Sequence, residues 1–562
     1  MTGLGKMAGT GGATGLMSGG LMISVGDAGD DITDIWFAHN GESLAWTTAD
    51  GTAALARSWC IKCSGTTLPA MRLTFSLGGA EDGSEYAVLF RESDAASWTR
   101  LPVSADVSLG MVSVNLPAGL PSGYFTLGKT GAGATLERPC AAVGSGLAGW
   151  YRADTGVTVA GGVVTTWRNL GLVGSAADFT ASGSLRLSTS AFPRASGASE
   201  ASISFDGSSY MTTAEATKWY TAANNNNTWF AVFRLGAGVA PSNMGVFGEV
   251  DNNGSRFGAF FVQAAQGVVT ALRTHAFVDN NSGMFCVMQD TGILGGEASL
   301  IDSCRFGKYV DSYLDGRWQD GKYKSDMSAA KSSRFNMGKM LSLFSFNGDI
   351  AEVRVYNRTL KTVERNIVAN HLAARYGIAL RDNLLYGGAA DGCGLDVVGI
   401  GCTTADTKVA DGSSGGNIHV AGDVTVSDNS AGLTLSAAGT LADGDYVLAG
   451  HGVKDNAWVP VTLDVKRLKR AWHVTKTNAA SLGLSLAFTL ADAGVGLLDA
   501  KERPVYGLFR SLDGGATWSA VDVPLVQTAG GFTCTLPASA FAEGQYTLGA
   551  HVTPCGTMMI FR

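Results

Sequence analysis

Alternation of apolar and polar residues runs through most of this chain, and one stretch departs from it. Residues 346–356 alternate with a period of two, which is the pattern of a half-buried strand. After them the apolar residues move to helical spacing. This predicts a closing strand followed by one short amphipathic helix at the end of a β-domain, because Gly377 follows the last apolar position. The apolar stripe of that helix consists of Leu360, Val363, Ile367, Val368, Leu372 and Tyr376.

The two ends of the chain repeat each other. Asp34-Ile-Trp-Phe-Ala-His39 resembles Asp445-Tyr-Val-Leu-Ala-Gly-His451, and the two histidines lie 412 positions apart. The repeat predicts one β-module used twice, built as a small antiparallel sandwich. Further matches are Trp46 with Trp458, Arg57-Ser-Trp59 with Arg470-Ala-Trp472, Val88-Leu-Phe-Arg91 with Gly507-Leu-Phe-Arg510, Trp98 with Trp518, and Gly123–Gly128 with Gly544–Gly549.

The first copy is shorter at its front. From Gly3 to Ala38 there are 36 residues, against 51 from Gly399 to Ala449, and the missing part matches residues 417–426. A sandwich that lacks a hairpin leaves an edge strand to be covered. The apolar tail Thr557, Met558, Met559, Ile560 and Phe561 has no counterpart in the first copy. One interpretation is that the tail adds to the sheet edge of a neighbouring subunit, and the other is that it packs on its own module.

A family resemblance covers residues 147–380. Its motifs are Leu147-Ala-Gly-Trp-Tyr-Arg-Ala-Asp154, Gly161-Gly-Val-Val-Thr-Thr-Trp167, Phe205-Asp-Gly-Ser-Ser-Tyr210 and Asn347-Gly-Asp-Ile-Ala-Glu-Val-Arg-Val-Tyr-Asn-Arg358. These segments resemble a bacterial laminin-G-like domain of the concanavalin-A-type jelly roll. The resemblance implies the fold and leaves the function open, because such sandwiches serve as lectins, adhesins, glucanases and spacers.

The predicted fold class is therefore all-β, with a central jelly-roll sandwich and one short C-terminal helix, flanked by two homologous small antiparallel β-sandwich modules. The predicted domains are the first β-module at 1–138, the jelly roll at 139–382, the second β-module at 383–553 and a tail strand at 554–562. Module, jelly roll and module in series favour an elongated or chain-like object over a compact enzyme.

The composition of the chain limits the classes of partner to be expected. Charged residues make up 16%, well below the usual quarter, and the net charge of -7 is mild, so nucleic acid is not an expected partner. No apolar run approaches the roughly 18 to 20 residues needed to cross a bilayer, so membrane insertion is not expected. The first residues carry no continuous apolar core of a secretory signal. Either the protein is cytoplasmic, or it is a mature extracellular chain without its signal peptide; the repeat favours the second. With nine cysteines at least one is unpaired, and Cys60-Ile-Lys-Cys63 has no second pair for zinc.

No catalytic constellation emerges, and the chain is predicted not to be an enzyme. Jelly-roll glucanases need two carboxylates about 5 to 5.5 Å apart, but Glu249-Val-Asp251-Asn-Asn-Gly254 has glycine at the second position. The segment Ser511-Leu-Asp513-Gly-Gly515-Ala-Thr517-Trp518 matches the Asp-box pattern. That pattern predicts a structural turn, in which Asp513 accepts backbone N–H bonds and Trp518 packs beneath.

Metal binding is left open. No cofactor is required, and Ca²⁺ at the rim of the jelly roll is an option with Asp154, Asp206, Asp251 and Asp349 as turn-adjacent carboxylates. The recurring His39 and His451 are expected to make turn-stabilising hydrogen bonds.

The leading functional hypothesis is an extracellular structural subunit of a bacterial surface filament, sheath or appendage. Such a subunit would associate head-to-tail with itself through its end modules, with strand addition as one route. The alternative is a carbohydrate-binding adhesin or lectin, in which the central jelly roll binds glycans through Trp219, Tyr220 or Trp318.

Overall fold

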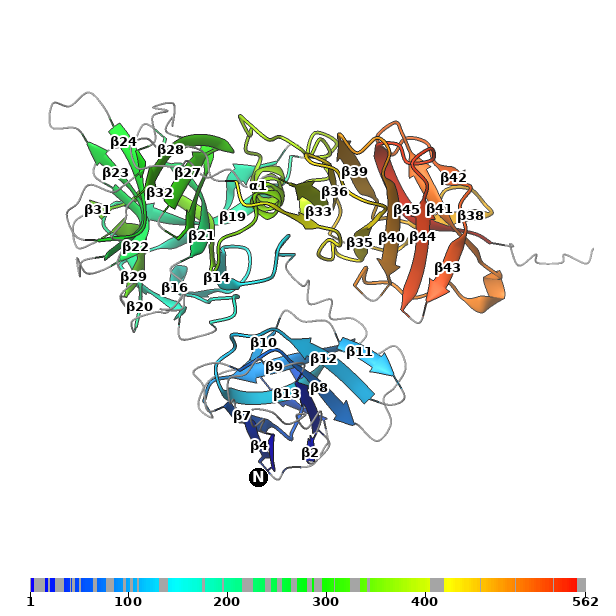
Figure 1. Ribbon diagram of the computed structural model, residues 1–562, viewed down its shortest axis with the longest axis horizontal. Coiled ribbons are helices and arrows are strands. Elements are labelled where there is room, and N and C mark those ends of the chain that lie inside the picture. Colours follow the sequence, from blue (N-terminus) through cyan, green and yellow to red (C-terminus); the bar gives the residue numbers. More distant parts are fainter. Residues whose placement is uncertain are drawn as a thin grey trace, which may run out of the picture. The chain divides into compact units, whose positions relative to one another are not determined.

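A computed structural model gives the architecture of the chain (Figure 1). It forms two compact units, residues 1–138 with 172–175, and residues 139–171 with 176–562. Among the described residues no helix is long and apolar enough to cross a membrane. The structure describes all residues except 1, 5–15, 19–20, 26–34, 41, 43–45, 50–51, 64–67, 77–84, 94–97, 102–104, 109–110, 131–139, 174–176, 195–196, 215–225, 238–243, 250–254, 264–269, 280–285, 288–295, 308, 324–333, 341–343, 405–418, 455, 491, 529 and 553–562.

The first unit is an antiparallel sandwich, called here the first module. Its inner faces bury Trp59, Phe75 and Phe125. One sheet contains β1 (Thr2–Leu4), β4 (Ile35–His39), β7 (Trp59–Cys63), β13 (Gly123–Thr130), β6 (Thr52–Leu55) and β5 (Trp46–Ala49) in that order. In the same sheet β9 (Glu85–Arg91) pairs with β13, and β10 (Thr99–Arg100) pairs with β9. The other contains β11 (Ala105–Ser108), β12 (Met111–Leu116), β8 (Met71–Ser76), β3 (Leu21–Val25) and β2 (Leu16–Ser18).

The second unit begins with a larger antiparallel sandwich, the jelly roll. One sheet contains β18 (Arg186–Pro193), β19 (Ser199–Asp206), β32 (Asn347–Tyr356), β21 (Asn227–Leu235), β26 (Ala298–Phe306), β27 (Tyr309–Leu314) and β28 (Arg317–Tyr323), with β14 (Leu147–Arg152) paired to β32. The other contains β15 (Val157–Ala160), β16 (Val163–Trp167), β17 (Phe179–Ser182), β20 (Tyr210–Thr213), β29 (Phe335–Met337), β22 (Met244–Glu249), β23 (Ser255–Gln263), β24 (Thr270–Asp279) and β25 (Cys286–Val287). A two-stranded ribbon joins β30 (Lys339–Met340) and β31 (Phe344–Ser345).

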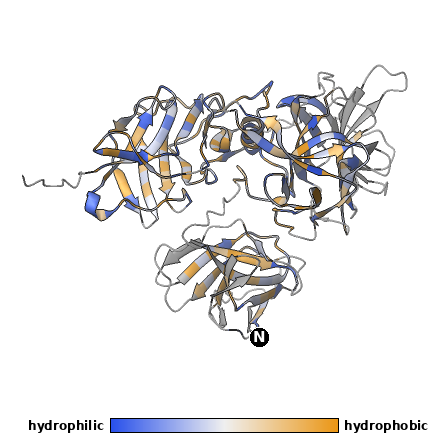
Figure 2. Ribbon diagram, turned by 180° about the vertical axis from the view of Figure 1, so that it is seen from behind, coloured by the Kyte–Doolittle hydropathy of each residue, from blue (hydrophilic) through white to orange (hydrophobic). Residues whose placement is uncertain are grey.

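The same unit ends with the second module. Figure 2 shows hydrophobic and hydrophilic residues alternating along its strands, as expected when one face of each sheet lies in the core. One sheet contains β34 (Gly422–Val424), β33 (Leu395–Thr403), β36 (Tyr446–His451), β39 (Trp472–Thr477), β45 (Gly544–His551), β38 (Val465–Leu468) and β37 (Trp458–Pro460). In the same sheet β41 (Val505–Ser511) pairs with β45, and β42 (Ser519–Val521) pairs with β41. The other contains β35 (Leu433–Ala438), β40 (Gly483–Thr489), β44 (Gly531–Leu536) and β43 (Leu525–Thr528), and a short 3₁₀-helix spans Ala500–Glu502.

The predicted all-β fold with a duplicated module is confirmed. The order β1-β4-β7-β13-β6-β5 repeats as β33-β36-β39-β45-β38-β37, and β11-β12-β8-β3 repeats as β43-β44-β40-β35. The register agrees as well, because Gly3 pairs with Trp36 where Gly399 pairs with Leu448. The strand β34, which pairs with β33, has no counterpart among the described strands of the first module.

One segment of the repeat is offset by one residue from its sequence match. Thr126 pairs with Leu89 and the equivalent Thr547 pairs with Phe509. Leu89 therefore corresponds to Phe509, whereas matching the letters Leu-Phe-Arg would align Leu89 with Leu508. The structural alignment puts Tyr86 opposite Tyr506 and corrects the letter match. Side chains alternate between faces, so a slip of one residue would exchange the core and outer faces of this strand.

Helix α1 (Thr362–Tyr376) lies between the jelly roll and the second module (Figure 1). The carboxylate of Glu364 accepts the Lys361 backbone N–H at 2.8 Å, which caps the N-terminus. Gly377, with φ of 67°, ends the helix in the left-handed region, and its N–H donates to Ala373. All fifteen residues of α1 are buried. The amphipathic periodicity of this segment predicts a helix with a solvated polar face. In the structure both the polar and the apolar face of α1 are buried.

Candidate functional site

One face of α1 packs on the second module. Because β33 carries glycines at this contact, the helix approaches its backbone closely: a Cβ atom at Gly399 would lie 3.3 Å from Ile367 Cγ1, and one at Gly401 would lie 2.9 Å from Val363 Cγ2. Leu448, on the neighbouring strand β36, is fully buried in the same cluster. Val363 and Ile367 are four residues apart and so lie on one side of the helix.

The opposite face of α1 packs on the jelly roll with polar side chains. Arg365 donates to the buried carboxylate of Asp302 at 3.2 Å, and its guanidinium lies 3.6 Å from the ring centroid of Tyr313. The ring of Tyr376 makes an edge contact with Phe192. Both faces of the helix are thus occupied, so the jelly roll and the second module are joined into one body.

A buried carboxylate is the centre of the polar contacts. Glu352 of β32 accepts hydrogen bonds from Arg354 Nε at 2.6 Å, Trp150 Nε1 at 2.7 Å and the Tyr376 hydroxyl at 2.7 Å. Burial opposes the charged form, but the guanidinium groups of Arg354, Arg152 and Arg375 outweigh it and hold the pKa of Glu352 at about 2. Glu352 is therefore ionised and fully hydrogen-bonded.

Arg375 connects the jelly roll to the second module. It donates to Asp154 at 2.5 Å and to Glu200 at 2.8 Å, and its Nη1 lies 3.9 Å from Asp396 of β33. Asp396 in turn lies 3.0 Å from Nε2 of His451. Burial disfavours the charged carboxylate, yet His451 and the arginines lower the pKa of Asp396. This ionic network is largely shielded from solvent, with side-chain exposures of 19% for Asp154 and 18% for Asp396, and it links the jelly roll to the second module.

His371 belongs to the same joint. Its Nδ1 lies 2.9 Å from the Val397 carbonyl oxygen, to which the neutral imidazole donates. Burial, assisted by the nearby Arg354, lowers the pKa of His371 to about 3. The imidazole therefore stays uncharged at neutral pH.

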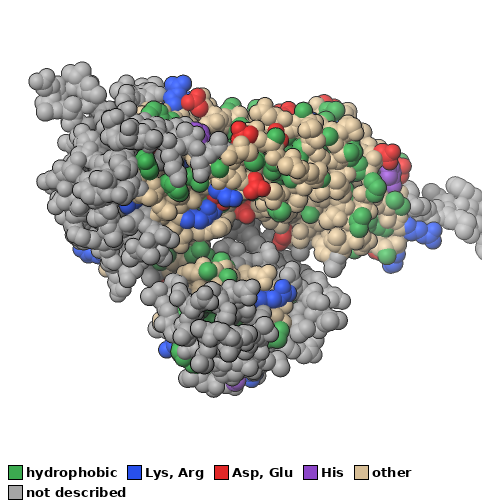
Figure 3. All heavy atoms as spheres, in the orientation of Figure 1, with side chains coloured by type: hydrophobic (Ala, Val, Ile, Leu, Met, Phe, Trp, Pro, Cys, Tyr) green, Lys and Arg blue, Asp and Glu red, His purple; other side chains and the backbone are tan. Residues whose placement is uncertain are grey.

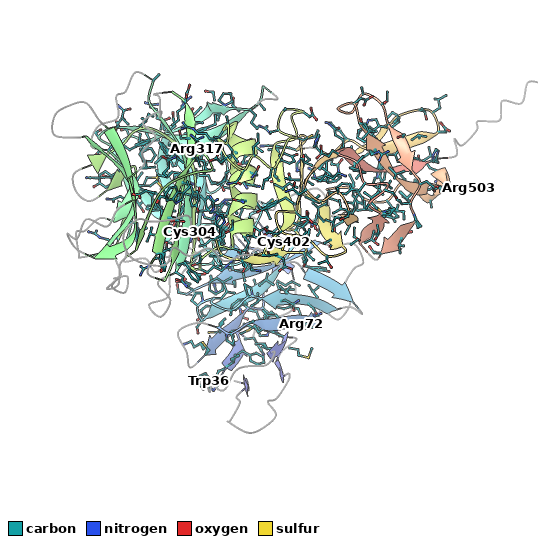
Figure 4. All side chains as sticks on the ribbon, turned by 45° about the horizontal axis from the view of Figure 1, so that its top comes forward. Trp36, Arg72, Cys304, Arg317, Cys402 and Arg503 are labelled. Carbon is teal, nitrogen blue, oxygen red and sulfur yellow. The ribbon has the colours of Figure 1, made fainter. Side chains whose placement is uncertain are left out.

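The equivalent face of the first module has no such helix among the described residues of its unit. Trp36 corresponds to Leu448 and is 40% exposed. Figure 4 shows Trp36 at the margin of the module. Lys62, which pairs with Trp36, is exposed, and Ala38 and Cys60 beside them are half-buried. We call these residues, with Gly3 of β1, the open face.

Next to Cys60 of the open face, the side chains of Tyr124, Arg91 and Trp98 lie together. Tyr124 pairs with Cys60, and the Arg91 guanidinium lies 5.3 Å from the Tyr124 ring and 4.5 Å from the Trp98 ring. In the second module Gln545 takes the place of Tyr124 and is buried near Cys393. The two copies therefore differ on this face at the position of Tyr124 and Gln545. On the side shown in Figure 3, the described Lys and Arg side chains form small separate groups.

The predicted glycan-binding residues are only partly described. Trp318 lies on β28 at the end of its sheet, is half-buried and pairs with Tyr313. Its indole nitrogen is shielded from solvent and makes no hydrogen bond with the described residues. Trp219 and Tyr220 lie outside the described residues, as do Thr557, Met558, Met559, Ile560 and Phe561.

The Asp-box residues form a hairpin turn. Asp513 accepts from the Ser511 hydroxyl at 2.6 Å and the Thr517 backbone N–H at 2.9 Å. Trp518 donates its indole N–H to the Gly515 carbonyl at 3.0 Å. Hydrogen bonds from the Ser511 and Thr517 hydroxyls lower the pKa of Asp513. All of the hydrogen bonds to Asp513 come from residues of the turn, so the carboxylate holds the hairpin together.

Three of the carboxylates proposed as calcium ligands make contacts with other protein groups. Asp154 pairs with Arg152 and Arg375, Asp349 accepts from Arg234 and Ser204, and Asp206 accepts from the Ser208 and Ser209 backbone. Asp251 lies outside the described residues. In the part of the chain that the structure describes, no three His, Cys, Asp or Glu side chains are close enough to hold a metal.

The cysteines whose side chains the structure describes are free thiols: Cys60, Cys63, Cys140, Cys304, Cys393, Cys402 and Cys534. Cys304, Cys393 and Cys402 are buried and unbonded to one another. Burial raises the pKa of Cys304 to about 12 and that of Cys393 to about 11. Cys304 and Cys393 are therefore protonated at neutral pH.

Comparison with known proteins gives weak structural likeness only. No family model matches the chain, and no curated protein matches it. Domain 4 of an extracellular GH43 arabinanase from Geobacillus stearothermophilus, solved with arabinotriose, is 13% identical over 40% of this chain and 98% of its own, with a TM-score of 0.27. A CBM40 of the Ruminococcus gnavus IT-sialidase is 12% identical over 25% of this chain and 82% of its own, with a TM-score of 0.20. The Trypanosoma rangeli sialidase is 11% identical over 63% of this chain and 61% of its own, with a TM-score of 0.30.

Sequence reasoning identified Trp36 and Tyr124 only as marks of the repeat. The signal that distinguishes them is the difference between the copies. Tryptophan stands where the second copy has Leu448, and tyrosine stands where it has Gln545. A position that changes from covered leucine to exposed tryptophan indicates a change in what covers the face.

Proposed function

We propose that this chain is a non-enzymatic structural protein of a bacterial surface, which holds β-sandwich domains in series and associates with further copies through its end modules. The observation that carries the proposal is the complete burial of α1 between the jelly roll and the second module. A helix held on both sides by apolar and ionic contacts prevents relative motion of the two domains. Such a joint suits a load-bearing array better than a catalyst that must open and close.

The first module supports the assembly part of the proposal. Among the described strands, β1 pairs only with β4, whereas its equivalent β33 lies between β34 and β36. An edge strand without its neighbour is a place for strand addition. The apolar residues 557–562 are the proposed donor strand.

Light scattering with negative-stain imaging tests the assembly. The full chain is expected to form linear oligomers whose length rises with concentration, and deletion of residues 557–562 is expected to shorten them to monomers. Replacing the same six residues with a polar segment of equal length is the control for chain length. Unchanged oligomers in the deletion variant would remove the strand-addition route, and monomers of the intact chain would remove the structural role.

Carbohydrate binding by the jelly roll is the second candidate. The observation that favours it is Trp318, a half-buried indole on the edge strand β28 beside the exposed Arg317 labelled in Figure 4. An aromatic ring next to a guanidinium is a common carbohydrate contact. The resemblance to laminin-G-like domains agrees with this candidate, and one calcium ion is proposed as an accessory. A glycan array is expected to give a signal that Trp318→Ala removes and EDTA weakens; an array without signal excludes the candidate.

A further inference from the structure

We infer that the open face of the first module is a docking site for an α-helix supplied by another polypeptide. The inference deepens the proposed structural role by naming the chemistry of one contact. It starts from the duplication: the equivalent face of the second module is covered by α1, and Leu448, which α1 covers, corresponds to Trp36. The same sheet order and register place both residues at one position of one fold.

The open face retains the feature that lets a helix approach. Gly3 pairs with Trp36 as Gly399 pairs with Leu448, and in the second module any Cβ at Gly399 would press on Ile367 of α1 and on Leu448. Glycine at this strand position leaves room for an aliphatic side chain of a helix. Ala38 adds a second small residue beside Trp36.

Trp36 supplies the contact energy for such a partner. It is among the described large hydrophobic side chains left exposed in the first module, at 40%. Tryptophan is enriched among residues that dominate binding interfaces. A helix that presents aliphatic residues four apart, as α1 presents Val363 and Ile367, matches a small strand residue flanked by a large apolar one.

The α1 helix of a second copy is not the occupant, because all fifteen of its residues are buried within its own chain. The partner is therefore an independent helix with the contact pattern of α1. Glycan binding to the same aromatic face is less favoured, because it explains neither the glycine nor the correspondence with a helix-bound face.

A helix-stabilised peptide tests the inference. The probe is a fluorescein-labelled peptide of residues 358–380 with Lys and Asp introduced at positions 365 and 369 and joined as a lactam, on the side opposite Val363 and Ile367. Fluorescence anisotropy with the full chain is expected to show saturable binding. Trp36→Ala is expected to weaken it at least tenfold, and so is Ile367→Asp in the peptide. Val505→Ala, which changes a 68% exposed valine of the second module, is the matched control and is expected to change nothing.

The remaining outcomes overturn the inference. Absence of saturable binding, or binding that Trp36→Ala leaves unchanged, excludes a helix site on this face. A glycan-array signal that Trp36→Ala removes, without peptide binding, assigns the face to carbohydrate. Self-association that Trp36→Ala abolishes and the peptide does not compete assigns it to a second copy. The oligomer length of the tail-deletion variant is measured without the peptide. The proposed assembly is therefore tested independently of the helix-docking site.

Discussion

Trp36 and Leu448 occupy the same position in two copies of one module, yet Leu448 is fully buried under α1 and Trp36 is 40% exposed. The fold around them is the same in detail. The Thr126 hydroxyl donates to the Arg57 carbonyl at 2.7 Å, and the equivalent Thr547 hydroxyl donates to the Arg470 carbonyl at 2.8 Å. At this position the two copies therefore differ in what lies on the sheet, in addition to the strand β34, which has no counterpart among the described strands of the first module.

Truncation at these two positions is expected to have unequal effects. Leu448→Ala leaves a cavity under α1 and is expected to lower the free energy of unfolding of its unit by about 2–5 kcal/mol. Trp36→Ala removes an exposed side chain and is expected to cost about 1 kcal/mol or less. Urea unfolding of both variants measures the difference. Equal losses would mean that Trp36 is covered in the native protein.

The close approach of α1 to β33 gives a second prediction. Gly399→Val places side-chain atoms against Ile367 and Leu448 and is expected to destabilise the second unit by about 1–3 kcal/mol through overpacking. The matched control is Gly507→Ala, at a strand glycine whose nearest neighbour atom would lie 3.7 Å from the new Cβ. If both variants unfold at the wild-type urea concentration, α1 does not pack on β33 as described.

The ionic network predicts a large effect at Glu352. Glu352→Gln leaves the buried guanidinium of Arg354 without its carboxylate and is expected to cost about 3–5 kcal/mol. The control is Arg317→Gln, which breaks a pair with Asp382 whose side chains are about half exposed, and it is expected to cost about 0–1 kcal/mol. Thermal unfolding distinguishes them. If Glu352→Gln leaves the free energy of unfolding unchanged, Glu352 is not ionised in the folded state.

Acid is expected to loosen the same joint through His371. Its pKa is lowered from 6.5 to about 3 in the folded protein, so the unfolded chain binds the proton first. The stability from the neutral imidazole is present above pH 6.5 and is lost as the pH falls from 6.5 toward 3. The stability difference between wild type and His371→Gln is expected to shrink over that range. A difference independent of pH would show that His371 titrates normally.

Sequence patterns predicted much of this fold because apolar periodicity shows which side of a strand or helix each residue lies on. The repeat spacing, the strands and the ends of α1 all follow from apolar periodicity and from Gly377. The one-residue offset of β9 against β41 was missed because identical letters at Leu-Phe-Arg outweighed the equally visible match of Tyr86 with Tyr506. Only pairing with a distant strand decides between the two.

The polar side of α1 could not be predicted from the sequence. Periodicity treats Arg365, His371 and Arg375 as a solvated face, because it contains no information about partners distant in the chain. Their partners come from two sandwiches: Asp302 from β26, Val397 from β33 and Asp154 from the turn after β14. The apolar stripe predicts the contacts of only one half of the helix surface. The other half is an interface with the jelly roll because of the buried ionic network.

Hydrogen exchange at the open face tests the central claim most directly. Mass spectrometry of the full chain, with and without the lactam-bridged peptide of residues 358–380, follows the amides of β4 and β7. We expect exchange to slow in residues 35–39 and 59–63 when the peptide is added, and to stay unchanged in β43 at 525–528. Exchange that is unaltered at β4 and β7, or that slows only in the second unit, would contradict it.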